Sequence, residues 1–280
     1  MSNILIAIKN LVQNPILKVT DRDSGRNRIN AVGASLELYI KDLLANCNTQ
    51  HTDAQKLEKY AQVFSYLGNQ NNPPDLMIKN GDAVEIKKIQ SAGSAIALNS
   101  SYPKSKLYSN SSMITASCKT CEPWSAKDLI YVIGQTSDDT IKNLWFIYGD
   151  VYCASPETYE RITTTIANGI NSIPDVEFSK TNELGKVKKV DPLGITDLRI
   201  RGMWHIENPR KVFSYLNLST SHQNFQFFCL MRKEKFESFD QADRNALNDL
   251  NTSLSIDTVK IKNPDNPAQL IDAILIKFSI

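Results

Sequence analysis

An Asn-Gly pair at residues 80–81 constrains the fold of this chain more than any other local feature. Short apolar runs at residues 76–78 and 83–86 flank this pair. Because Asn and Gly readily adopt the backbone conformations of a tight turn, the pattern is the strongest short-range signal for a β-hairpin. The sequence therefore predicts that a sheet begins here. The length of the turn then fixes which side chains of the two strands share a face.

Hydrophobic periodicity predicts the elements around the hairpin. Apolar residues recur at intervals of three and four in the expected helices, whereas β-branched and aromatic runs mark the expected strands. Helices are expected at residues 4–12, 29–44, 54–67 and 241–250, with Thr52 as the N-cap of the third, and a further one begins at Ser155-Pro156. Strands are expected at residues 129–133 and 144–148 and near 198–206 and 225–231, and a last apolar segment covers 270–278. These elements predict an α/β chain with a central sheet.

Size and charge narrow the class of protein. A chain of 280 residues that is 41% hydrophobic buries a sizeable core, and it shows neither an internal repeat nor a linker that would divide it. The net charge of +2 excludes coating of nucleic acid by bulk charge, so a nucleic-acid surface has to be local. No apolar stretch reaches the ~20 residues of a membrane span, and residues 4–8 are too short for a secretory signal. We expect a soluble, cytoplasmic protein whose five scattered cysteines are reduced.

Three side chains bring chemistry to the hairpin: Asp75, Glu85 and Lys87. Two neighbouring carboxylates repel each other unless a cation lies between them, and hard oxygen ligands suit Mg²⁺. A lysine beside them can orient the attacking water or stabilise phosphate charge, while the metal lowers the pKa of that water. The set predicts metal-dependent phosphodiester hydrolysis. A solvent-facing Glu-x-Lys strand is the competing interpretation, although apolar Val84 and Ile86 on the other face indicate a buried strand.

The register of the hairpin decides whether the two acids meet. Glu85 and Lys87 are two residues apart and hence share a strand face. A two-residue loop, Asn80-Gly81, would pair Asp75 with Ile86 and separate the acids. A three-residue loop at 79–81, with Gly81 in the left-handed conformation, would place Asp75 opposite Glu85. The predicted chemistry requires the second register.

Pro74-Asp75 followed by Glu85-Ile86-Lys87 resembles the PD-(D/E)XK nuclease signature. Together with the SGRNRIN block at 24–30, Glu37, and the IALNSSYPKSKL block at 96–107, the hairpin resembles the NgoPII-type family of type II restriction endonucleases. The likeness covers the N-terminal half well and the C-terminal half loosely. It implies a PD-(D/E)XK restriction-endonuclease-like core, in which helices flank a mixed central sheet.

The resemblance also implies a function. Such an enzyme cuts both strands of double-stranded DNA at a short palindrome, here GGCC, with Mg²⁺, and leaves 5′-phosphate and 3′-hydroxyl ends. It implies a homodimer and a cognate DNA methyltransferase encoded nearby. We expect one restriction-endonuclease domain over residues 1–280. Residues 1–155 would hold the catalytic core, and the mixed part at 156–280 would contribute DNA recognition and dimer contacts.

Within that scheme Asp75, Glu85 and the carbonyl of Ile86 bind the metal, and Lys87 positions the water. Glu37 would approach the metal from its helix, since a helical Glu often does so in such nucleases. An i,i+4 pair between Glu37 and Lys41 on a solvated face is the alternative.

Polar and basic residues elsewhere are candidate DNA contacts. Donors that suit backbone oxygens and base edges are Arg26, Arg28, Asn99, Ser100, Ser101, Lys104 and Lys106. Residues 180–211 hold eight basic against four acidic side chains, and Arg199 and Arg201 share one strand face from which they can read guanine. Solvated surface is the alternative for each. Cys118 and Cys121 lack a second pair at zinc-site spacing, so their role stays open.

Two other functions fit the same residues. A repair or recombination nuclease of this fold would read DNA structure instead of sequence. A sequence-specific DNA-binding protein with purely structural carboxylates would bind a palindrome without cutting it. Digestion of mapped plasmid DNA separates the three, because only a sequence-specific nuclease gives discrete bands.

Overall fold

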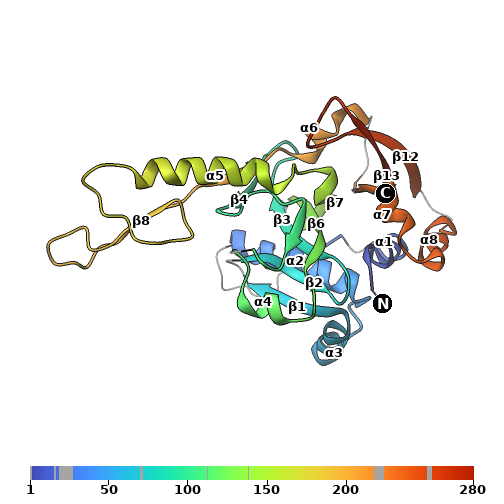
Figure 1. Cartoon of the computed structure of the whole chain (residues 1–280). Coiled ribbons are helices and arrows are strands. Elements are labelled where there is room, and N and C mark those ends of the chain that lie inside the picture. Colours follow the sequence, from blue (N-terminus) through green and yellow to red (C-terminus); the bar gives the residue numbers. More distant parts are fainter. Residues whose placement is uncertain are drawn as a thin grey trace.

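A mixed nine-stranded sheet is the centre of the described structure (Figure 1). The computed structural model describes residues 2–15, 17–18, 28–69, 72–111, 113–137, 139–216, 218, 224–250 and 254–280, and for 28–35 and 69 the backbone alone. In spatial order the strands are β1 (Phe64–Asn69), β2 (Asn72–Ile78), β3 (Ala83–Ile89), β6 (Ala126–Ser137), β7 (Thr140–Tyr148), β11 (Gln226–Arg232), β13 (Leu270–Ser279) and β12 (Ser255–Lys262), while β5 (Lys106–Tyr108) pairs with β6. The β3–β6 and β7–β11 pairs are parallel, and the other neighbours are antiparallel.

Helices flank this sheet. They are α1 (Ile4–Gln13), α2 (Arg28–Leu44), α3 (Asp53–Val63), α4 (Ala116–Thr120), α5 (Pro156–Asn171), α6 (Pro209–Val212), α7 (Lys233–Glu237) and α8 (Gln241–Asn248), with short 3₁₀ turns η1 (Gly149–Val151) and η2 (Ser214–Leu216). α1 packs on α2 and α8, α2 on β3, and α7 on β11 and β13. The predicted mixed α/β fold is thereby confirmed. Within the described ranges no helix is long and apolar enough to span a membrane.

Two predicted elements differ from the structure. The third helix ends at Val63, because residues 64–67 join the sheet in β1: Phe64 and Tyr66 are buried and Leu67 is 44% exposed, which is a strand period. The segment at 198–206 is two short strands, β9 (Leu198–Ile200) and β10 (Trp204–Ile206), which belong to different two-stranded sheets. The sequence interpretation did not include β12 or α7.

The core lies around the middle strands β6, β7 and β11. Their apolar runs are nearly continuous because both faces of these strands are covered. Trp145 of β7 stacks on Phe228 of β11, with 4.4 Å between ring centroids. Strands from residues 1–155 and from 156–280 thus share one sheet, and the proposed assignment of roles to these two parts stays a prediction. All five cysteines are free thiols.

An arm projects from this core (Figure 1). We define the arm as residues 156–203, which contain α5 and the small sheet of β8 (Gly185–Val187) with β9. At the base of the arm, β10 pairs antiparallel with β4 (Ile96–Asn99). The chain that leaves the arm is therefore tied to the segment that follows the β2–β3 hairpin.

Candidate active site

The Ile78 N–H donates to the Asp82 carbonyl at 2.9 Å, just before β3 begins, so the turn between these paired residues has three residues, 79–81. This turn sets the register on which the site depends. Leu76 lies opposite Val84. Continued by one residue, this register places Asp75 opposite Glu85, which is the alignment that the chemistry requires. The backbone pairing of β2 with β3 stops at this point. The backbone N–H of Ile86, the residue after Glu85, donates instead to Asp75 Oδ2 at 2.5 Å.

The turn differs from the prediction in one detail: Asn80, with φ of 52°, adopts the left-handed conformation, and Gly81 does not. Asn tolerates this conformation because its short polar side chain can hydrogen-bond locally. Buried Lys127 anchors the turn by donating from Nζ to the Gly81 carbonyl at 2.6 Å. Glu122 pairs with Lys127 and accepts the Asn80 N–H at 3.1 Å. These contacts hold the longer loop in place.

Glu85 and Lys87 lie on one face of β3, as predicted, and contact each other. Lys87 Nζ is 2.6 Å from Glu85 Oε1, and both side chains are largely buried. Glu85 Oε2 is buried and has no hydrogen-bond partner among the described residues. A buried carboxylate oxygen without a donor is costly unless a cation or water satisfies it. Its chemistry therefore fits a divalent metal between Glu85 and Asp75.

Burial and like charge set the protonation of the cluster. Burial first, and then the Glu85 carboxylate, raise the pKa of Asp75 to about 7, although Lys87 opposes them. Burial acts to lower the pKa of Lys87, but the carboxylates of Glu85 and Asp75 outweigh it and raise that pKa. Without a metal, the Asp75 carboxyl group is therefore partly protonated near neutral pH, and the Lys87 side chain is a protonated ammonium group.

Glu37 of α2 acts on the same cluster through its charge. Its charge raises the pKa of both Asp75 and Lys87, so it lies within electrostatic reach of them. It also forms the i,i+4 pair with Lys41, at 2.6 Å. The described residues contain no group of three or more His, Cys, Asp or Glu side chains placed to share a metal. The contacts of Glu37 are thus those of the alternative interpretation, and its approach to the metal stays a prediction.

An open cleft of about 330 Å³ contains the cluster. Its lining brings together side chains that the sequence interpretation assigned separately to catalysis and to DNA contact: Asp75, Glu85, Lys87, Asn99, Ser100, Ser101 and Arg201. A larger cleft of about 820 Å³ continues under the arm and shares Ser100 and Arg201 with the first. A single concave surface thus runs from the acids of the hairpin to the arm.

Lys104 is a second lysine near the acids, which the sequence interpretation assigned to DNA. It is only 6% exposed, and its Nζ donates to Ser101 Oγ and to the Tyr102 carbonyl. Burial lowers its pKa to about 8, against the opposing effect of the Glu85 carboxylate. The backbone N–H of Lys104 donates to the hydroxyl of buried Tyr131 at 2.8 Å, and Tyr131 lies on β6, the strand beside β3. The ammonium therefore faces the protein interior, and no sequence signal indicated this.

The other predicted DNA contacts that the structure describes are divided between β5, the arm and the start of α2. Lys106 on β5 pairs with Asp128 at 3.0 Å. Arg199 and Arg201 lie on the arm and both contact Glu183. Arg26 lies outside the described residues, and Arg28 begins α2 with a side chain that is not described. The Cys118 thiol contacts the Met77 sulfur in the core, and the Cys121 thiol donates to the Cys118 carbonyl. The contacts of both cysteines are therefore packing and hydrogen-bond contacts within the protein.

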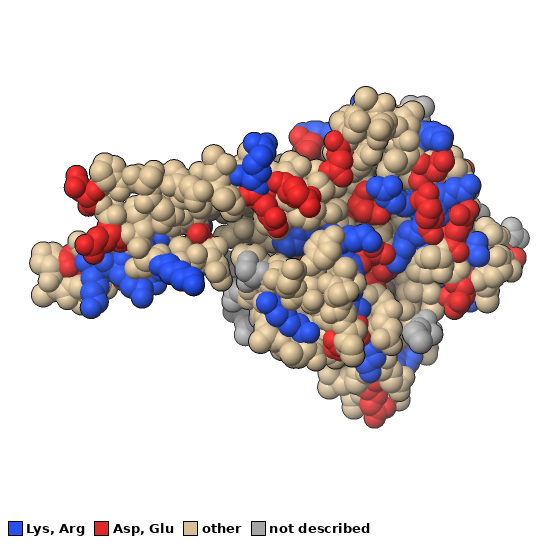
Figure 2. All heavy atoms as spheres, viewed as in Figure 1, with Lys and Arg blue, Asp and Glu red and all other residues tan. Residues whose placement is uncertain are grey.

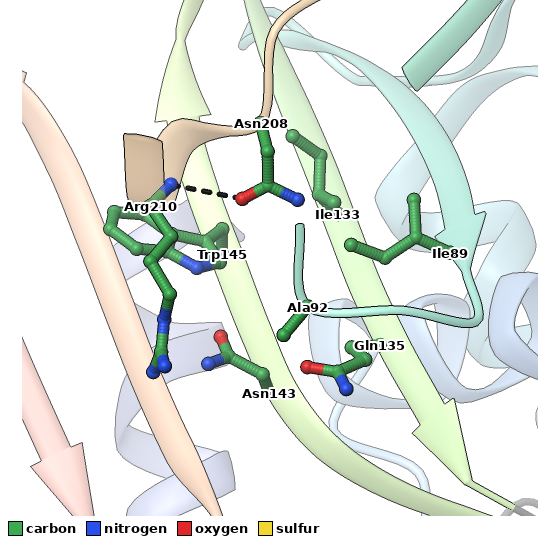
Figure 3. Close-up of a pocket in the computed structure, with 8 residues that line it drawn as sticks. All are labelled: Ile89, Ala92, Ile133, Gln135, Asn143, Trp145, Asn208 and Arg210. Atoms are coloured by element: carbon green, nitrogen blue, oxygen red, sulfur yellow. Dashed lines mark hydrogen bonds between the residues drawn. The ribbon is translucent and has the colours of Figure 1, made fainter. Parts of the chain in front are cut away.

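A second hollow lies further along the same face of the sheet, where Ile89 follows Glu85 and Lys87 on β3 (Figure 3). It holds about 10 Å³, the space of one water molecule, and is lined by Ile89, Ala92, Ile133, Gln135, Asn143, Trp145, Asn208 and Arg210. The Arg210 N–H donates to Asn208 Oδ1 at 3.0 Å, as the dashed line in Figure 3 marks. No acidic side chain lines this hollow. The cleft at the β2–β3 hairpin is therefore the candidate active site.

Comparison with known proteins agrees with this geometry. Residues 2–262 match the family model described as NgoPII restriction endonuclease. The chain is 45% identical over 280 residues to the protein named Type II restriction enzyme NgoPII from Neisseria gonorrhoeae, which covers 99% of this chain and 100% of that relative. No solved structure gives a significant match. The resemblance seen in the hairpin and its two neighbouring blocks is confirmed, and the chain belongs to the NgoPII restriction endonuclease family.

Proposed function

We propose that this type II restriction endonuclease uses Mg²⁺ to hydrolyse both strands of double-stranded DNA at the palindrome GGCC. The observation that carries the proposal is the convergence of Asp75, Glu85 and Lys87 in the lining of one cleft, where Glu85 Oε2 is buried and no described residue donates to it. The GGCC site comes from the family resemblance alone. A homodimer, a cytoplasmic location and a cognate methyltransferase gene complete the proposal.

In this scheme Asp75, Glu85 and the carbonyl of Ile86 hold the metal. When bound, Mg²⁺ supplies positive charge that lowers the pKa of the attacking water. Lys87, fixed by its contact with Glu85, holds the water or stabilises the charge that develops on the phosphate. The water oxygen joins phosphorus and gives up one proton to the solvent, the bond between phosphorus and the 3′-oxygen breaks, and the leaving 3′-oxygen takes one proton from the solvent. The ends are then a 5′-phosphate and a 3′-hydroxyl.

The first test is metal dependence together with substitution of the cluster. Chelation should abolish cleavage, and Ca²⁺ should support binding without cleavage because its coordination is longer and looser. Asp75→Ala, Glu85→Ala and Lys87→Ala should each lose cleavage by orders of magnitude while they still bind the site. Glu37→Ala should be milder. The measurement is digestion of mapped plasmid DNA, with binding followed separately in Ca²⁺.

Lys88→Ala is the matched control, since Lys88 neighbours Lys87 on β3 but points to the opposite face. It should cut at close to the parent rate. Full activity of Lys87→Ala, or of the parent in excess chelator, would contradict the proposed mechanism. Discrete bands separate a sequence-specific cutter from a structure-specific nuclease of the same fold. Site-specific binding with no cleavage under any metal would indicate the DNA-binding alternative.

A further inference from the structure

One acidic side chain on the arm contacts two arginines. Glu183 accepts from Arg199 Nε at 2.9 Å and Nη2 at 2.6 Å, and from Arg201 Nε at 2.5 Å. The two arginine side chains are 54% and 52% exposed, whereas that of Glu183 is 16% exposed. The carboxylate therefore lies behind a pair of guanidinium groups that remain open to solvent.

Charge on this part of the arm is unbalanced. Residues 180–201 hold six basic side chains against three acidic ones, a surplus of three positive charges. Glu183 carries one negative charge between two guanidinium groups, so the trio alone keeps one positive charge. Figure 2 shows basic side chains gathered along the lower edge of the arm. This face is suited to a polyanion.

The arginines also lie at the catalytic cleft. Arg201 lines both the hollow that holds Asp75 and Glu85 and the larger one under the arm, and Arg199 lines the larger one. Exposed ion pairs contribute little to stability, so stability alone gives no reason for two arginines to converge on one acid. Orientation does give a reason, because bidentate contact removes the freedom of a guanidinium group.

We propose that Glu183 is a positioning residue for DNA recognition, which holds Arg199 and Arg201 toward the cleft so that they contact guanine edges. The inference rests on the proposed function. Glu183 engages Arg201 through Nε only, which leaves both Nη groups outside the pair. A guanidinium edge with two donors matches O6 and N7 of guanine. Glu183 itself touches no DNA in this arrangement and acts only through the arginines.

The test compares Glu183→Gln with the parent enzyme on three duplexes in Ca²⁺: the mapped cognate site, its single-base variants and random DNA. Loss of one bidentate contact corresponds to roughly 5- to 150-fold in discrimination between cognate and variant sites. Glu183→Gln should lose discrimination within that range. Its binding to random DNA should stay equal or become tighter, because the substitution removes a negative charge. A purely structural role would weaken all three complexes alike.

Asp197→Asn is the matched control. It removes the same charge from the same arm, but Asp197 pairs with Lys186, at 3.1 Å, and not with the arginines. Discrimination should stay at the parent level in this variant. Arg201→Lys keeps the charge and removes the planar fork, so it should lose discrimination as Glu183→Gln does, and the double variant should lose little more. Thermal unfolding checks that each variant is folded.

The outcomes separate two failures. A parent enzyme with clear sequence preference that Glu183→Gln retains overturns this inference and leaves the proposed function intact. Equal loss in Asp197→Asn also overturns it, because bulk charge would then be the cause. A parent with no sequence preference overturns the inference and the proposed function together. Selective loss in Glu183→Gln and Arg201→Lys supports the inference.

Discussion

Burial of Asp75 beside Glu85 gives the site a carboxyl group that binds a proton near neutral pH. The pKa of Asp75 rises to about 7 in the folded protein, from an ordinary value of 3.8. At pH values between these two pKa values, Asp75 holds a proton in the folded chain that it has lost in the unfolded chain. The stabilising effect is therefore complete below about pH 4 and is lost as the pH rises through 7. A metal at the proposed site would replace that proton, so metal affinity should increase over the same pH range.

Asp75→Asn should remove this pH dependence. The substituted side chain keeps an oxygen that can accept the Ile86 N–H but cannot ionise. Both proteins are compared without metal. Between pH 4 and 7, the free energy of unfolding of the variant should rise relative to that of the parent by on the order of 1.4 kcal/mol for each pH unit. Chemical denaturation at pH 4.5, 6 and 8 in chelator measures this gain. A difference that stays constant over these pH values would mean that Asp75 ionises normally.

Individual residues show how far the sequence specifies the site. The two-residue spacing of Glu85 and Lys87 was enough to predict their shared face, and the three-residue loop was one of two registers that the sequence allowed. Choice between the registers required Lys127, a residue 46 positions beyond Gly81 that binds the turn. The inward turn of Lys104 and the grouping around Glu183 also depend on distant contacts. No local pattern contains that information.

At the scale of elements, an aromatic cluster fixes the segment after the hairpin to the arm. Tyr102 stacks on Tyr159 of α5, with 5.7 Å between centroids, and meets Trp204 of β10 edge-on at 6.4 Å. The Tyr102 hydroxyl donates to Glu160 Oε1 at 2.9 Å. Since Ser100 and Ser101 line the cleft that contains Asp75 and Glu85, these contacts couple the position of the arm to the shape of the candidate site.

Tyr102→Ala should loosen this coupling. Two aromatic contacts at roughly 0.5–1.5 kcal/mol each give an expected loss of about 1–3 kcal/mol in unfolding free energy. Amide hydrogens at residues 99–104 should exchange faster, and cleavage should slow. Tyr102→Phe keeps both ring contacts and loses one exposed hydrogen bond, so it should remain close to the parent. Equal effects of the two variants would assign the role to the hydroxyl instead of the ring.

Elements whose type follows from their own residues were predicted correctly. The segment at 64–67, whose type depends on pairing with a neighbouring strand, was not. The β-branched and aromatic runs of β6, β7 and β11 indicated strands, and Thr52 marked the start of α3, where its side chain accepts the Gln55 N–H. The helical spacing that placed Phe64 in α3 was outweighed by pairing of this segment with β2. The hydrogen bonds and burial that a sheet edge offers are invisible to a local window.

At the scale of the whole molecule, a buried charge network joins the two halves of the chain. Lys235 of α7 donates to Asp82, which directly precedes β3, at 2.6 Å and to Asp128 of β6 at 2.8 Å. The Tyr148 hydroxyl donates to the same Asp82 at 2.7 Å. The strand that carries Glu85 and Lys87 is thus held at its origin by the C-terminal part. The β2–β3 hairpin is therefore not an independent unit within the chain.

The proposed homodimer leads to a prediction about the whole assembly. The described part of each chain holds one set of Asp75, Glu85 and Lys87, whereas a duplex presents two strands of opposite direction. Two copies related by a two-fold axis match the symmetry of a palindrome and place one set at each strand. A mixed dimer of the parent chain with Lys87→Ala should then cut one strand only.

Purified mixed dimers, selected with two different affinity tags, should convert supercoiled plasmid with a single site to the nicked circle and stop there. The parent dimer should give linear DNA, and a dimer of two Lys87→Ala chains should give neither product. Sedimentation should show twice the mass of one chain in all three preparations. Linear product from the mixed dimer at half the parent rate, without accumulation of nicked circles, would indicate that one active site cuts both strands in turn. Symmetry would then serve DNA binding and not the division of labour between two active sites.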